Sequence, residues 1–318
     1  MWQYLAKRFI HGLTVIWLVA TTVFVAVRLV PGGPVAAMLG PESADPEAIQ
    51  RIEEQLGLND PIYIQYIDYM ADLILLDMGN SVRRGVPVSD ILANSIPMTL
   101  SITLVGLIFG LSIAIPAGII SATHRYSKRD YLATIAAFLG LSMPAFFIGI
   151  LLMLVFAVWL NLLPSFGYTS IREGITPWFK SILLPGIAVG APYCAVIMRM
   201  MRGSLLDIKD QQYMTTARAK GLSERVVLYK HALQNALIPV LTIGGIQIVL
   251  IITGSVTVEI VFAIDGLGNV IVSSIIERDY PVVQGAILVI ATLMVVVNIT
   301  VDVLYTYLDP RIRYGDDL

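Results

Sequence analysis

The sequence predicts an all-α integral membrane protein with six transmembrane helices. Only 14% of its 318 residues are charged, whereas a soluble domain usually carries about 25%. Six apolar runs reach the length of about 20 residues that a helix needs to cross the hydrocarbon core. Backbone polar groups in lipid must be satisfied within the chain, so we expect each run to be a helix.

The predicted spans cover residues 9–30, 97–122, 131–160, 181–201, 236–261 and 283–307. They divide the chain into an N-terminal transmembrane helix (1–30), an external segment (31–93), a transmembrane domain of five helices (94–308) and a tail (309–318). The first run follows Lys7 and Arg8 and is too long for a typical signal peptide, so we interpret it as an uncleaved anchor. Two short external helices are expected, over about 45–55 and 61–76.

Basic residues gather in alternate connections, and this pattern sets the orientation. They precede the first span, follow the second, fill a polar loop at 204–235 and lie in the tail, whereas the segment 31–93 is rich in acids. By the positive-inside rule both termini are cytoplasmic, in the cell inner membrane. The net charge of −2 does not suggest nucleic-acid binding. One cysteine and three scattered histidines predict neither a disulfide framework nor a metal site.

Small residues recur at every fourth position in two of the spans. The second has Gly106, Gly110, Ala114 and Gly118, and the fourth has Gly186, Gly190 and Cys194. Lipid tails give helices no hydrophobic reason to associate, so such rows predict close contact between helix backbones. The sequence leaves open whether the partner helix belongs to this chain or to another.

Two further sets of residues are candidates for a translocation path and for an external gate or docking surface. Pro144 predicts a kink in the third span, and polar residues inside spans are costly and often functional. The path candidates are Met143, Pro144, Phe147, Gln247 and Asn298. A fixed kink and ordinary hydrogen bonds between helices are the alternatives. The external candidates are Gly266, Leu267, Gly268, Asp279 and Tyr280, where we expect the glycines to allow a tight turn and close backbone approach. An ordinary re-entrant connection is the alternative.

The polar loop between the fourth and fifth spans predicts two short helices at the membrane surface. Asp210 is suited to cap a helix that runs through Lys220, and Gly221 to end it in the left-handed conformation. Ser223 then caps a second helix that leads into the fifth span. A rigid element attached to two spans would transmit a displacement caused by a partner protein to both spans. The alternative is an amphipathic helix that rests on anionic lipid.

Within this loop, residues 213–224 read YMTTARAKGLSE and resemble the EAA loop of binding-protein-dependent ABC importers. The resemblance is closer to the dipeptide, oligopeptide and nickel branch, in which the general pattern's Glu and Ala are replaced as they are at Thr215 and Thr216. HALQNALIP at 231–239, RDYPV at 278–282 and DPRIRY at 309–314 fit the same family. The coupling residues this implies are Tyr213, Thr215, Thr216, Ala217, Arg218, Ala219, Lys220, Gly221, Ser223 and Glu224.

The resemblance implies a type I ABC importer permease fold and a non-catalytic subunit that forms half of a path for di- or oligopeptides. It implies a second homologous permease chain in a heterodimer, two ATP-binding subunits and an extracytoplasmic substrate-binding protein. ATP and magnesium would be bound by the ATPase partners, since the sequence has no G-x-x-x-x-G-K-[ST] phosphate loop. Nickel, glutathione or another small solute is the alternative cargo. A stand-alone secondary transporter, expected to show inverted repeats, and a membrane scaffold are the remaining alternatives.

We expect Gly221→Pro or Ala217→Trp to abolish ATPase association or coupling while the chain still inserts in the membrane. Proline fixes φ near −65° and cannot follow a helix end that needs a positive φ. Membrane insertion, co-purification of the ATPase and ATP-driven uptake are the measurements. Normal uptake by both variants would contradict a lever role for this loop.

Overall fold

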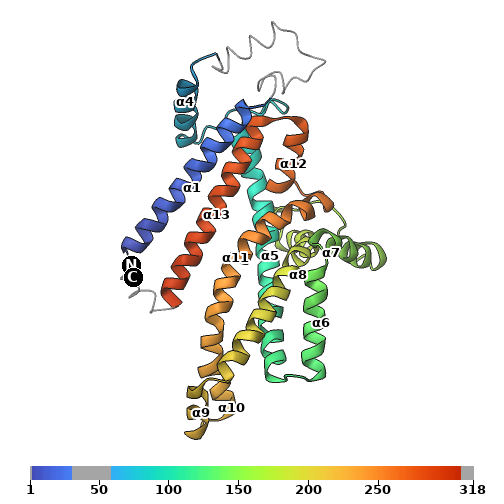
Figure 1. The fold of residues 1–318 in the computed structure, drawn as a ribbon. Coiled ribbons are helices and arrows are strands. Elements are labelled where there is room, and N and C mark those ends of the chain that lie inside the picture. Colours follow the sequence, from blue (N-terminus) through green and yellow to red (C-terminus); the bar gives the residue numbers. More distant parts are fainter. Residues whose placement is uncertain (1, 31–58, 309–318) are drawn as a thin grey trace. The chain divides into compact units, whose positions relative to one another are not determined.

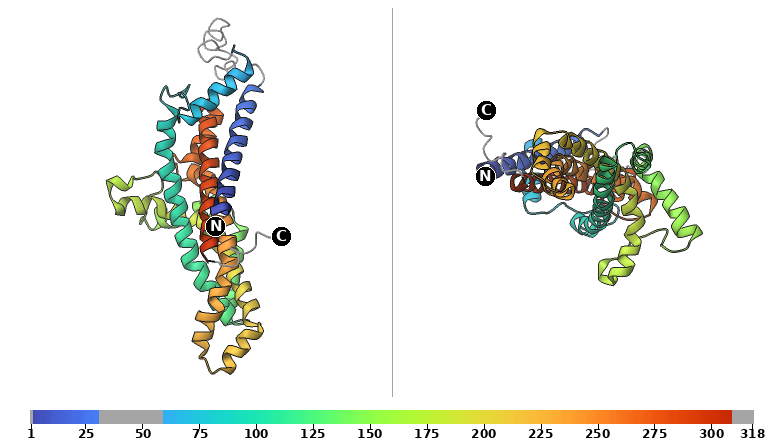
Figure 2. Two further views of the ribbon diagram at one scale, coloured as in Figure 1. Left: turned by 90° about the vertical axis from the view of Figure 1, so that its left-hand side faces the viewer. Right: turned by 90° about the horizontal axis from the view of Figure 1, so that it is seen from below.

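The computed structural model describes residues 2–30 and 59–308, which are helical apart from turns and loops (Figures 1 and 2). The α-helices are α1 (Trp2–Arg28), α4 (Ile62–Ile74), α5 (Val88–Thr123), α6 (Lys128–Ser142), α7 (Ala145–Leu152), α8 (Ile175–Lys209), α9 (Gln212–Ala219), α10 (Glu224–Val226), α11 (Leu233–Val261), α12 (Leu267–Glu277) and α13 (Tyr280–Leu308). Met153–Trp159 and Val227–Ala232 are π-helical, and Ile171–Glu173 is a 3-10 turn. In these ranges β-pairing is limited to an isolated bridge between Asn80 and Pro87.

Five helices are long and apolar enough to cross a membrane. They are Ala6–Arg28, Val88–Thr123, Ile175–Lys209, Glu224–Val261 and Tyr280–Val303. A sixth crossing is formed if the bent pair Lys128–Ser142 and Ala145–Trp159 counts as one span. This confirms the predicted all-α membrane fold.

The third predicted span is broken, not gently kinked. Its two halves meet at an angle of 107°. Met143 is extended, with φ −97° and ψ 133°, and Pro144 caps the start of α7. A proline ring clashes with a helical conformation in the residue before it, so α6 must end at this point.

The chain divides into two compact units, and α8 is the central helix of one of them. This unit holds residues 99–264 and the last turns of α13 from Thr300. In α8, 67% of the most apolar window is buried, against 39% or less in the other four long helices. The helix packs against α6, α7 and α11.

Helices α5 and α8 approach so closely that their backbones touch. A Cβ atom on Gly190 would lie 2.5 Å from the carbonyl oxygen of Gly106, and one on Gly186 would lie 2.5 Å from Cγ1 of Val105. Glycine is therefore required on both helices. The predicted rows of small residues thus find their partner within this chain.

The second unit comprises residues 2–98 and 265–299. In it α1 and α13 run side by side, and a Cβ atom on Gly12 would lie 2.6 Å from Cγ1 of Val295 (Figures 1 and 2). Helix α4 corresponds to the external helix predicted at 61–76. It contacts α1, where the ring of Tyr66 packs edge to face against that of Phe24. The helix predicted at 45–55 lies outside the described residues.

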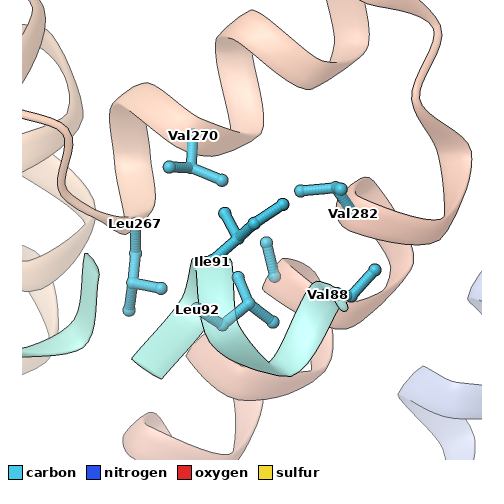
Figure 3. Packing of buried hydrophobic residues seen from close by; sticks show 7 residues of the cluster. Val88, Ile91, Leu92, Leu267, Val270 and Val282 are labelled. Atoms are coloured by element: carbon cyan, nitrogen blue, oxygen red, sulfur yellow. The ribbon is translucent and has the colours of Figure 1, made fainter. Parts of the chain in front are cut away.

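The core of this unit is built on a helix that the sequence analysis missed. We expected Gly266 to Gly268 to form a tight turn, and this was wrong: Gly266 has an ordinary φ of −75° and caps the start of α12. Leu267 and Val270 of α12 pack against the first turns of α5 and α13 (Figure 3). The cluster comprises Val88, Ile91, Leu92, Leu267, Val270, Val282 and Ala286.

We expect Gly190→Ala to lower the free energy of unfolding by about 1–3 kcal/mol or more, as overpacking of a core does. The added methyl group would collide with the backbone of Gly106, which cannot move aside as a side chain can. The measurements are thermal unfolding in detergent and the yield of inserted protein. Gly254→Ala is the control, because a Cβ there meets nothing within 4 Å. Equal stability of the two variants would contradict the observed α5–α8 contact.

Candidate functional site

The predicted lever loop is formed by α9 and α10, which lie at the ends of α8 and α11 (Figures 1 and 2). Asp210 ends α8, and Gln211 is the residue that precedes α9. The expectation that Asp210 caps α9 was therefore wrong, because α8 continues to Lys209. Gly221 follows α9 with φ +76°, as its predicted role as a left-handed stop requires. Ser223 precedes α10 but makes no side-chain capping bond.

Helix α9 has one face buried within the chain and one face exposed. Met214 is 1% and Ala217 8% exposed. The helix packs on the π-helical turn Val227–Ala232, whose first and last residues are fully buried. The small size of Ala217 therefore serves packing inside this chain. The exposed predicted residues of the loop are Tyr213, Thr215, Thr216, Arg218, Ala219, Lys220, Gly221, Ser223 and Glu224.

Short polar contacts connect α9 to the segments that follow it. Nε of Arg218 donates to Oε1 of Glu224 at 2.7 Å. Both side chains are exposed, so this pair contributes about 0–1 kcal/mol and is easily exchanged for a partner. Asn235 donates to the hydroxyl of Tyr213 at 3.5 Å, from the first turn of α11. Any pairing of Arg218 with another subunit would therefore have to replace a bond within the chain.

Just before α9, the end of α8 is bonded to the α5–α6 hairpin. Arg202 donates through Nε and Nη2 to the two carboxylate oxygens of Asp130, at 2.8 and 2.9 Å. Asp130 is 3% exposed. Ser121, at the end of α5, also donates to this carboxylate. The sequence alone does not indicate this pair, since its members are 72 positions apart and no spacing rule connects them.

A second buried carboxylate joins α11 to α5. Glu259 is fully buried, and its Oε1 accepts hydrogen bonds from Thr99 at 2.7 Å and from Ser255 at 3.0 Å. Glu259 was not among the polar residues that we predicted to be functional in the spans. An acidic residue inside an apolar run was the signal available.

One predicted path residue lines a cavity beside the break between α6 and α7. The cavity has a volume of about 150 Å³ and is bounded by α7, α8 and α11. Ala145, Tyr193 and Gln247 are among its lining residues. Met143, Pro144 and Phe147 adjoin it in sequence but do not line it. Asn298 is exposed on α13, in the other unit.

The predicted gate residues mostly lie inside their unit. Gly266, Leu267, Gly268 and Asp279 are buried, and Tyr280 is half-buried. The carboxylate of Asp279 accepts bonds from the hydroxyl of Ser81 and from the backbone N–H groups of Val82 and Arg83. It therefore fixes the loop before α5 to the turn between α12 and α13.

Comparison with known proteins gives matches over nearly the whole chain. Residues 114–314 match the family described as binding-protein-dependent transport system inner membrane component, and residues 1–103 match its N-terminal family. The dipeptide transport system permease protein DppB of Alkalihalophilus pseudofirmus is 39% identical, over 99% of this chain and 100% of its own. At 38% identity and the same coverage are the oligopeptide permease AppB of Bacillus subtilis and the glutathione permease GsiC of Escherichia coli.

A solved structure shares the fold of the larger part of the chain. The inward-facing MetNI methionine ABC transporter is similar with a TM-score of 0.57 at 19% identity, over 69% of this chain and 96% of that chain. At this identity the similarity concerns the fold alone.

We expect Met214→Ala to loosen α9 from the π-helical turn Val227–Ala232, which is its seat in this chain, because truncating a buried methionine costs about 2–5 kcal/mol. Hydrogen exchange at residues 210–223 should become faster while exchange in α8 and α11 does not change. Thr215→Ala, which shortens an exposed side chain of the same helix, serves as the control. Equal exchange in the two variants would contradict the buried seat.

Proposed function

The chain belongs to the family of binding-protein-dependent transport system inner membrane components, and we propose that the cargo it transports is a di- or oligopeptide. It is a multi-pass inner-membrane permease subunit of an ABC importer, which works with ATPase subunits and a substrate-binding protein. The observation that supports peptide cargo is the 38–39% identity, from end to end, to relatives named as peptide permeases. Glutathione, the cargo named for another relative, is itself a tripeptide.

The proposed assembly pairs this chain with a second, homologous permease chain, two ATP-binding subunits and one substrate-binding protein. The chain itself is non-catalytic in this proposal, and ATP and magnesium are bound by the ATPase subunits. The absence of a phosphate-loop motif from the sequence supports this division of roles.

The α9 end of the chain is proposed to be cytoplasmic, together with both termini. The bond between Arg202 and Asp130 supports this orientation, because it holds the α5–α6 turn beside the end of α8. The basic residues of both segments are thus on the same side. They are Arg125, Lys128, Arg129, Lys209, Arg218, Lys220, Arg225 and Lys230. The positive-inside rule then assigns that side to the cytoplasm.

In the proposed mechanism the exposed face of α9 contacts an ATPase subunit, and its buried face passes the movement to the spans. Thr215 and Thr216 offer small polar side chains to the partner, with Lys220 beside them. Because α9 is attached to α8 on one side and through the π-helical turn to α11 on the other, displacement of α9 moves both helices. Allosteric coupling requires such an element, one that can adopt two positions and whose equilibrium is shifted both by the ATPase site and by the cargo site.

The proposed path for the cargo passes the cavity that Gln247 lines. Gln247 and Tyr193 offer hydrogen-bonding groups without net charge in an otherwise apolar wall. Such groups suit the amide backbone that all peptides share, and they leave discrimination between side chains to the binding protein. Met143, Pro144, Phe147 and Asn298 remain candidates for other parts of the path.

The test is ATP-dependent uptake by the assembled complex in proteoliposomes. The complex is purified from cells that express this chain with its partner subunits, and it is supplied with labelled dipeptide, oligopeptide or nickel. We expect accumulation of peptide that requires ATP and the binding protein. Uptake of nickel alone, or uptake driven by a proton gradient without ATPase subunits, would overturn the proposal.

Thr216→Trp tests the contact on α9. A bulky side chain on the exposed face should weaken ATPase association at least about tenfold, which corresponds to about 1.4 kcal/mol. The seat of α9, followed by hydrogen exchange, should not change. Leu162→Trp, at an exposed residue in a different loop of the same unit, is the control. Normal ATPase binding by Thr216→Trp would place the contact elsewhere.

A further inference from the structure

The carboxylate of Asp130 joins more segments than an ordinary ion pair does. Oδ1 accepts from Nε of Arg202 at 2.8 Å, from the hydroxyl of Ser121 and, at 3.4 Å, from that of Thr134. Oδ2 accepts from Nη2 of Arg202 and from the backbone N–H of Tyr126, both at 2.9 Å. Helix α5, the α5–α6 turn, α6 and α8 thus share one buried anion.

This anion also fixes a strained turn. Tyr126 has a positive φ of 64°, which residues with a side chain rarely adopt. Its N–H is held by Asp130, and Ser127 caps α6 by accepting from the N–H of Asp130. The short connection between α5 and α6 is therefore built around the same carboxylate that receives Arg202.

Arg202 lies where α8 passes the end of the α5–α6 hairpin, and Ser204 and Leu205 beyond it are still buried. Its neighbour Met201 packs against Gly118 of α5, where an added Cβ would lie 2.7 Å from Cβ of Met201. Beyond Arg202 the helix continues for two turns to Lys209 and then leads into α9. Among the residues that the structure describes, the bidentate bond is the last polar connection between α8 and the α5–α6 hairpin before α9.

Net stability does not require such a pair. Burying two charges costs hydration free energy, and their mutual attraction offsets this cost only when the geometry is good. Proteins in which such a pair is replaced by apolar residues are often equally stable. A bidentate arginine–carboxylate pair instead fixes the relative orientation of the two helices, because its two parallel hydrogen bonds resist rotation of one helix against the other. The geometry thus favours a mechanical role over a purely stabilising one.

We propose that Asp130 and Arg202 are positioning residues of the transport cycle, which lock the end of α8 to the α5–α6 hairpin so that displacement of α9 moves the three helices as one rigid body. Without the lock, the end of α8 would shift against the α5–α6 hairpin, and the movement would not be passed to all three helices. This inference rests on the proposed role of α9 in coupling and assigns a specific connection to it.

The decisive variant is the double replacement Asp130→Asn with Arg202→Met. It removes both charges together, so neither is left buried without a partner, which is the main cost of single replacements. We expect the complex to assemble, to keep its ATPase and to hydrolyse ATP, while the peptide transported per ATP falls at least about tenfold. Arg202→Lys keeps the positive charge but loses the two-pronged guanidinium. Its peptide transport per ATP should lie between that of the parent chain and that of the double variant.

Gly203→Ala is the matched control. It changes the next residue of α8 at a place where an added Cβ meets nothing within 4 Å, and it leaves the pair intact. Its transport per ATP should equal that of the parent chain. Normal transport per ATP by the double variant would overturn the proposal, and so would failure of that variant to assemble, which would assign the pair to folding.

A second measurement does not depend on the cargo. Spin labels at the exposed residues Lys128 and Asp210, with Cys194→Ser to remove the native thiol, report the distance from the hairpin to the end of α8. This distance should not change between nucleotide-free and ATP-trapped complexes of the parent chain, and it should shift or broaden in the double variant. A shift in the parent would overturn the lock. Absence of peptide uptake by the parent, with the distances as expected, would overturn only the proposed cargo.

Discussion

The close crossing of α5 and α8 is the contact on which the larger unit depends. At Gly106 and Gly190 the two backbones meet with no side chain between them, so the crossing cannot be relaxed by a change of rotamer. In a membrane this matters more than in water, because lipid offers helices no hydrophobic gain for associating. Around this fixed crossing, α8 buries itself among α6, α7 and α11, and its far end leads into the loop that we propose contacts an ATPase subunit.

The two faces of α9 differ in their surroundings, which suits the coupling role that we propose. Met214 and Ala217 attach it to its own chain, and the threonines between them are exposed. An eight-residue helix is too short to be stable by itself, so its seat on the π-helical turn is what allows it to transmit a displacement. The weak, exposed pair between Arg218 and Glu224 adds little to that seat.

Much of this arrangement could be predicted from the sequence, because it follows from local chemistry. Apolar length predicted the spans, small residues at every fourth position predicted the crossing, and Gly221 predicted the end of α9. The misses have equally definite causes. The pairing of Asp130 with Arg202 and of Glu259 with Thr99 depends on how helices distant in sequence come together, which no periodicity encodes. Helix α12 was missed because two glycines close to its start were weighed as a turn, although glycine is also an acceptable residue before a helix.

The break between Met143 and Pro144 has a consequence for what can surround this part of the chain. A helix that starts anew exposes the N–H groups of its first turn, and those of Ala145 and Phe146 have no acceptor within α7. Hydrocarbon supplies no acceptor either, so the acyl chains of the bilayer are excluded as neighbours of this corner. Whatever lies against it, whether water or another polypeptide, must be able to accept hydrogen bonds.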